Sequence, residues 1–120
     1  MDNKDFGNML ERRTKMFALR IINLSSEMSD SIENKIIRNQ IVKSGTSIGA
    51  NYREANKSRS KADFRNKIKI CLGEANETIY WLELMLDSAR IDKTKGLQIY
   101  NECQELVAIF TSIVQKLVKR

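Results

Sequence analysis

Residues 60–89 read SKADFRNKIKICLGEANETIYWLELMLDSA, a stretch in which apolar and polar residues alternate with the period of a helix. The apolar or small residues of one side are Phe64, Ile68, Cys71, Ala75, Leu82, Leu86 and Ala89. This spacing predicts a long amphipathic helix that packs one side on a core. Ser60 followed by Asp63 predicts its N-cap. At about 1.5 Å per residue the helix extends over roughly 45 Å.

Three further segments have the same spacing. The first contains Leu10, Thr14, Phe17, Ile21, Leu24 and Met28. The second contains Ile37, Ile41, Ser44, Ile48, Tyr52 and Ala55, and the last contains Ile99, Cys103, Leu106, Phe110, Ile113 and Leu117. Four such segments with short connections predict an all-α fold, an antiparallel up-down-up-down four-helix bundle. We expect residues 1–120 to form a single domain of this kind.

Two local patterns concern the second segment. Asp30 with Glu33 predicts the N-cap of its helix. Gly45 and Gly49 lie in its middle, where a glycine costs about 1 kcal/mol relative to alanine. Either a neighbouring helix approaches closely at these positions or a ligand does, and we favour the helix.

The composition excludes several kinds of site. The chain has 120 residues and a net charge of +6, with no proline and no histidine. Without histidine it lacks the commonest general base and metal ligand. A phosphate-binding glycine loop and a Gly-x-Ser-x-Gly motif are also missing. We therefore expect no catalytic residues, no metal and no cofactor. Glu74, Glu77 and Glu83 are expected to pair with arginines across helices or subunits.

The expected location is the cytoplasm. No apolar run approaches the roughly 18 residues that cross a membrane, and the polar N-terminal residues lack a signal-peptide core. Cys71 and Cys103 each lie on an apolar stripe. We expect both to be buried thiols in a reducing compartment.

The third helix has a second apolar side. At about 100° per residue, several large residues point away from its core stripe. We predict that this side joins subunits, through Ile70, Gly73, Glu77, Tyr80, Trp81 and Leu84. Exposed apolar patches generally mark such contacts. The alternative is that the first or second helix of the same chain covers this side.

Positive charge is concentrated around the connection between the second and third helices. We predict a nucleic-acid-binding surface made of Arg53, Lys57, Arg59, Lys61, Arg65, Lys67 and Lys69. Basic rows of this kind follow a phosphate backbone without reading bases. The alternative is an ordinary solvated helix end. Smaller clusters are Arg12, Arg13 and Lys15, and Lys116, Lys119 and Arg120.

Four stretches are similar to a known family: SIGANYREA (47–55), RSKADF (59–64), LGEANET (72–78) and YWLEL (80–84). They resemble the bacterial four-helix bundle family of proteins encoded in intervening sequences of 23S rRNA genes, also labelled S23 ribosomal protein. The resemblance covers roughly residues 10–118. Many relatives have glycine where this chain has Ala55.

The resemblance implies an antiparallel bundle that assembles into rings, typically homopentamers. The chain is also similar to diversity-generating retroelement accessory proteins, which form basic pentameric barrels that engage nucleic acid and a reverse transcriptase. The family offers no catalytic residues to transfer. Its motif residues are interpreted as structural, joining helices or subunits: Asn51, Glu54, Glu74, Glu77, Tyr80 and Trp81.

Together these patterns predict a non-catalytic, oligomeric, basic scaffold that binds RNA or DNA through phosphates, with other copies of itself and a reverse transcriptase as candidate partners. The alternative is a protein–protein scaffold with no nucleic-acid role.

Overall fold

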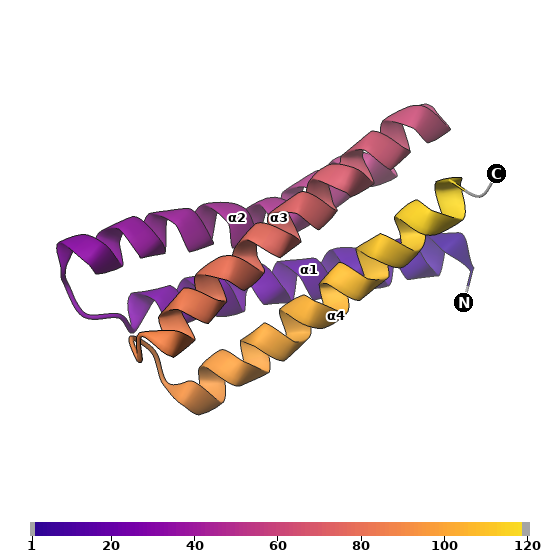
Figure 1. Cartoon of the computed structure of the whole chain (residues 1–120). Helices are drawn as coiled ribbons and strands as arrows, with labels where there is room; N and C mark the ends of the chain where they lie inside the picture. The colour runs from indigo at the N-terminus through magenta and orange to yellow at the C-terminus, as the bar shows by residue number, and fades with distance from the viewer. Residues whose placement is uncertain (1, 119–120) are drawn as a thin grey trace.

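Four long helices make up the computed structural model, which describes residues 2–118, with side chains for residues 2–117 (Figure 1). The helices are α1 (Asn3–Ser26), α2 (Ile32–Asn56), α3 (Lys61–Asp87) and α4 (Lys93–Val118). They form a rod of 47 × 25 × 21 Å. The predicted all-α four-helix bundle is confirmed. Lys119 and Arg120, which belong to the predicted C-terminal basic cluster, lie outside the described residues.

Successive helices run in opposite directions, and the connecting turns alternate between the two ends of the rod (Figure 1). The α2–α3 turn lies at the same end as both chain termini, and the α1–α2 and α3–α4 turns lie at the other end. α2 packs between α1 and α3, and α4 packs against α3 and less extensively against α1. Among the described residues no Cα atom of α1 lies within 8 Å of a Cα atom of α3, so these two helices lie diagonally across the bundle.

Short polar side chains set the helix starts. Ser60 caps α3 as predicted, accepting a hydrogen bond from the backbone N–H of Asp63 at 3.1 Å. The predicted Asp30 cap is wrong by one residue. Ser31 is the N-cap of α2, and its hydroxyl accepts from the backbone N–H of Asn34 at 3.0 Å. Aspartate and serine are both common N-cap residues, so the sequence pattern does not decide between the two adjacent positions, and the structure places the cap at the second.

The four predicted stripes form the core. All six residues of the first stripe are buried, as are five of the second. In α3 the buried side also includes Thr78 and Met85, while Leu86 is half-buried. The assignment of Ala89 to the stripe is wrong. Ala89 is exposed and lies beyond the helix with φ 54°, in the left-handed conformation that ends many helices.

Gly45 and Gly49 are positions where α1 approaches α2 closely. A Cβ atom at Gly45 would lie 3.0 Å from the Ile21 side chain, and one at Gly49 would lie 3.0 Å from the Thr14 hydroxyl. The preferred interpretation of these glycines, a neighbouring helix, is confirmed. Gly73 on α3 is different, because a Cβ atom there would meet nothing within 4 Å.

Two kinds of buried polar group link the helices. The Thr78 hydroxyl shares a 2.9 Å hydrogen bond with the Ser44 hydroxyl across the α2–α3 contact. The Cys71 thiol donates to the Ile48 carbonyl and the Cys103 thiol to that of Ala75. Both cysteines are free and fully buried, as the stripes predicted. Across residues 2–118, every helix is too short or too polar to cross a membrane.

Candidate interaction surfaces

The predicted interface side of α3 lies on the surface of the bundle. Ile70 is 44% exposed and Tyr80 is 53% exposed, and Gly73 and Glu77 are exposed beside them. The alternative that α1 or α2 covers this side therefore fails for these four residues. It holds in part for Trp81, which is half-buried and packs against the core, and for the half-buried Leu84.

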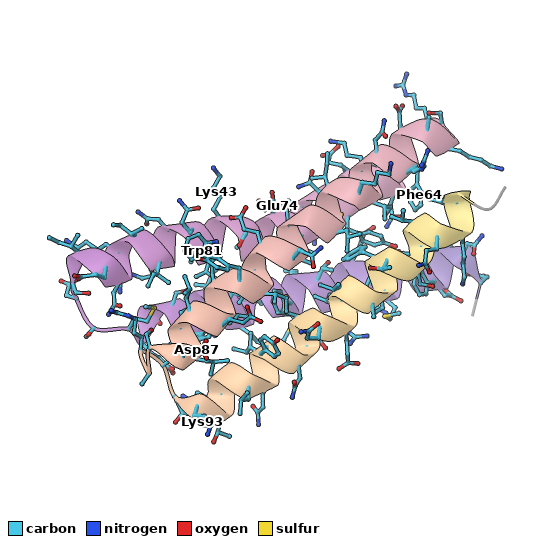
Figure 2. The ribbon with its side chains drawn as sticks, in the orientation of Figure 1. Lys43, Phe64, Glu74, Trp81, Asp87 and Lys93 are labelled. Carbon is cyan, nitrogen blue, oxygen red and sulfur yellow. The ribbon has the colours of Figure 1, made fainter. Side chains whose placement is uncertain are left out.

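The aromatic pair at the centre of this side is held in place locally. The Trp81 indole N–H donates to the Glu77 carboxylate at 3.2 Å. The Tyr80 and Trp81 rings meet edge to face with centroids 5.1 Å apart, a favoured arrangement for aromatic pairs. Figure 2 shows Trp81 between α2 and α3, with Lys43 and Glu74 on the same side of this helix pair. We refer to Ile70, Gly73, Glu77, Tyr80, Trp81 and Leu84 as the α3 face.

Negative charge on and beside the α3 face is incompletely neutralised within the chain. Burial, and to a smaller extent the neighbouring Glu77, raises the pKa of Glu74, while Lys43 lowers it. Glu83 accepts a hydrogen bond from the Tyr100 hydroxyl at 3.2 Å. In the part of the chain that the structure describes, no arginine lies within ion-pair distance of these glutamates. The predicted pairing with arginines across helices is therefore wrong within one chain.

The predicted basic residues divide among three places. Lys57, Arg59 and Lys67 line a depression of about 290 Å³ beside the α2–α3 turn, together with Glu54 and Asp63. The spacing of four places Lys61, Arg65 and Lys69 in a row along α3. Arg53 lies apart from both groups. It lines a different depression, between α1 and α2, where its guanidinium is 3.8 Å from the Glu11 carboxylate.

Six of the seven basic side chains have no acidic partner. Within residues 2–117, Lys57, Arg59, Lys61, Arg65, Lys67 and Lys69 make no ion pair. The Nε atom of Arg65 is buried and has no hydrogen-bond partner among the described residues. This end of the rod therefore has positive charge that the chain itself does not neutralise.

The smaller basic cluster on α1 is divided in the same way. Arg13 points to α4, where its guanidinium donates to Glu102 at 2.7 and 2.8 Å and to Glu105 at 3.1 Å. The bidentate hydrogen bond to Glu102 is the main reason that the pKa of Arg13 lies above the ordinary value of an arginine side chain. Arg12 and Lys15 are exposed.

A second apolar patch, which sequence reasoning missed, lies on α1. Met16 is 57% exposed, and Leu19 and Ile22 are each 44% exposed. The residues are three apart, so they follow one side of the helix. In the sequence MFALRII (16–22) these three residues are interspersed with the buried Phe17 and Ile21. The apolar pattern therefore does not show that they lie on a different side of the helix. We refer to Met16, Leu19 and Ile22 as the α1 patch.

Comparisons with known proteins match the chain to a family and to solved structures. Residues 9–112 match the family described as 23S rRNA-intervening sequence protein. A search of curated proteins finds no match to the chain. A solved structure from Bacteroides thetaiotaomicron VPI-5482, described as a protein with unknown function from the S23 ribosomal protein family, is 40% identical. The similarity covers 91% of this chain and 97% of that one, with a TM-score of 0.83. The chain therefore belongs to the 23S rRNA-intervening sequence protein family.

Proposed function

We propose that this protein is a non-catalytic, oligomeric four-helix bundle that binds RNA or DNA through phosphate groups. The observation that carries the binding is the set of six basic side chains near the α2–α3 turn that have no acidic partner among the described residues. Lysine and arginine side chains that are free to contact phosphates release counterions from nucleic acid, and this release drives sequence-independent binding.

Assembly is supported by the α3 face. Ile70 and Tyr80 stay exposed on a single bundle and Trp81 beside them is half-buried, and an apolar surface of this kind is typical of a protein contact. Gly73 adds an independent argument. It lacks the close helix neighbour that accounts for Gly45 and Gly49, although a mid-helix glycine costs about 1 kcal/mol. The backbone of another copy packed against Gly73 would offset that cost.

Assembly and binding act together in this proposal. The six exposed or half-buried cations of one chain bind weakly at physiological salt, whereas several identical sets on one particle bind one nucleic acid with increased avidity. A ring, a homopentamer in particular, presents the patches in this way. The protein belongs to a family named for 23S rRNA intervening sequences, and a structured RNA is therefore the first ligand to test. A role as a retroelement accessory factor, with a reverse transcriptase as partner, is a special case. The cytoplasm remains the expected location.

Binding is tested by measuring affinity for a structured RNA and a DNA duplex at two salt concentrations. We expect log affinity to fall with log salt with a slope of about −0.9 per phosphate contacted on a duplex. Replacing Lys57, Arg59 and Lys67 by alanine should weaken binding to every sequence and make the slope shallower. The control replaces Lys35, Lys93 and Lys95, three exposed lysines near the turns at the other end of the rod, of which Lys95 pairs with Glu27 at 2.8 Å. Equal losses for the two triple variants would contradict a localised binding site.

Assembly is tested by light scattering on the wild-type protein and on Trp81→Glu. We expect a wild-type particle several times the 13.9 kDa of one chain and a much smaller Trp81→Glu particle. A wild-type particle of one chain would refute assembly. An oligomer that binds neither RNA nor DNA would favour the second candidate, a protein–protein scaffold, for which the exposed α3 face is the specific evidence.

A further inference from the structure

A depression of about 560 Å³ lies at the end of the rod where the chain termini and the α2–α3 turn are found. All four helices line it, and its volume is within the range of about 300–1,000 Å³ that is usual for small-ligand sites. Aliphatic side chains of α4 form part of the wall. The remaining lining residues are the aromatic Phe6, Tyr52 and Phe64 and the polar Asn3, Asn56 and Lys116.

Three aromatic rings from three helices line this depression. Tyr52 is only 2% exposed, and its ring packs against that of Phe110 with centroids 5.8 Å apart, so its position is fixed by the core. Phe6 and Phe64 are half-buried, and Figure 2 shows Phe64 between the ends of α3 and α4. Half-buried rings that line a depression offer part of their surface to a planar ligand. Nucleobases stack on such rings whatever their sequence, because every base has a π face.

The polar residues of the depression suit an anionic ligand that also has hydrogen-bonding edges. Asn3, Asn56 and Lys116 are exposed. The Asn56 amide N–H donates to Glu11 at 2.8 Å, whereas Asn3 lies at the start of α1, where its carboxamide can pair with the edge of a base. Lys116 makes no ion pair within residues 2–117. Among the described residues no carboxylate lines the depression.

The depression adjoins the cations that carry the proposed phosphate binding. Lys61 precedes Phe64 by three residues, so the two side chains are neighbours on one turn of α3. Arg65 follows Phe64 directly, and its buried Nε atom has no hydrogen-bond partner in the described chain. A strand whose phosphates contact these cations therefore passes beside the aromatic rings.

We propose that this depression holds one unstacked base of a bound RNA strand, so that the protein prefers RNA with unpaired nucleotides to a continuous duplex. The inference rests on the binding part of the proposed function and adds the form of nucleic acid that is recognised. A base inside a duplex is paired and stacked on both sides, and extruding it is costly. An unpaired base in a loop is free to leave the stack and lie against aromatic side chains.

A fluorescent base in the RNA tests this inference. The probe is 2-aminopurine, an adenine analogue whose emission falls when it stacks, placed either in the loop or in the stem of one RNA hairpin. We expect the wild-type protein to quench the loop probe and to leave the stem probe unchanged. It should also bind the hairpin more tightly than a blunt duplex of equal charge at the same salt concentration.

Phe64→Leu removes a flat ring from the depression and keeps an apolar side chain there. It should weaken binding to the hairpin by about 5- to 150-fold, the loss expected for one stacked base, and leave binding to the duplex unchanged. The matched control is Phe17→Leu, the same replacement at a buried core position outside the depression, which should keep the wild-type preference for the hairpin. If circular dichroism shows that Phe64→Leu loses helical signal, Phe6→Leu in the first turns of α1 replaces it.

Three results would overturn the inference. A wild-type protein that binds neither RNA nor DNA removes it together with the binding part of the proposed function. Equal affinity for hairpin and duplex, with a loop probe that the wild-type protein does not quench, removes the inference alone and leaves phosphate binding intact. Adenosine monophosphate that displaces the hairpin at a concentration close to that of the RNA would assign the depression to a free nucleotide. We expect displacement only at far higher concentration, because one nucleotide lacks the other phosphate contacts of a strand.

Discussion

Replacing Gly73 by alanine should stabilise a single chain and weaken its assembly. In the helix interior alanine is favoured over glycine by about 1 kcal/mol. The new methyl group meets no atom within 4 Å, so this gain is not offset by a clash. For a chain of 120 residues, about 1 kcal/mol raises Tm by about 3–5 °C. In the oligomer the same methyl group lies where we infer a neighbouring bundle.

The two effects are measured separately. The free energy of unfolding is obtained from urea denaturation in a Tyr80→Asp background, in which we expect isolated chains. The dissociation constant is obtained by sedimentation in the wild-type background. Overpacking a tight contact costs about 1–3 kcal/mol, so the dissociation constant should rise about 5- to 140-fold, since 1.4 kcal/mol is a factor of ten.

The control for Gly73→Ala is Ala108→Gly on the exposed side of α4. It should lower the free energy of unfolding by about 1 kcal/mol and leave the dissociation constant unchanged. If Gly73→Ala fails to stabilise the isolated chain, the space above Gly73 is not open. If it stabilises the chain but leaves the dissociation constant unchanged, no neighbour approaches this glycine and the additional argument that Gly73 gives for assembly is lost.

Three further predictions concern the interior. Gly49→Ala should lower the free energy of unfolding, measured in urea, by about 1–3 kcal/mol, since the new methyl group meets α1 at 3.0 Å. This loss exceeds the gain from the higher helix propensity of alanine. A stabilised variant would contradict the close packing. Ser44→Ala and Thr78→Val should each cost about 1 kcal/mol, and the double variant less than their sum, because either change removes the hydrogen bond between the two side chains. The remaining hydroxyl keeps a backbone carbonyl as its acceptor, that of Glu74 for Thr78 and that of Ile41 for Ser44. Strict additivity would count against the bond between the helices. Burial raises the pKa of Cys71 and Cys103 from 9.0 to about 12. Between these pH values the unfolded chain loses thiol protons that the folded chain keeps, so the free energy of unfolding should fall by about 1.4 kcal/mol per pH unit and cysteine. The difference between wild type and a double Cys→Ala variant isolates this term, and a pH-independent difference would refute it.

The helix stripes could be predicted because the positions that a bundle buries recur along the sequence with the period of the α-helix. The uncertain positions were those where two neighbouring residues compete. Met85 and Leu86 are both apolar, and small differences in helix rotation decide that Met85 is fully buried. Asp30 and Ser31 are both good caps, and the turn geometry decides between them.

The surfaces were harder to predict than the core. Trp81 was identified because a large aromatic residue opposite a core stripe is conspicuous. The α1 patch was missed because Leu19 lies in an almost continuous apolar run, in which period alone does not separate the buried from the exposed side. The separation of Arg53 from the other basic residues depends on its contact with Glu11, a residue 42 positions away in the sequence.

Both chain termini lie at the same end of the rod as the α2–α3 turn (Figure 1). A purification tag or fluorescent fusion at either terminus is therefore delivered beside the cations that we expect to contact phosphate. A polyhistidine tag adds charge there, and a bulky fusion shields the site. In a circular permutant, the original termini are linked and the chain is opened within the α3–α4 turn instead. The label then lies at the opposite end of the rod and leaves these cations accessible.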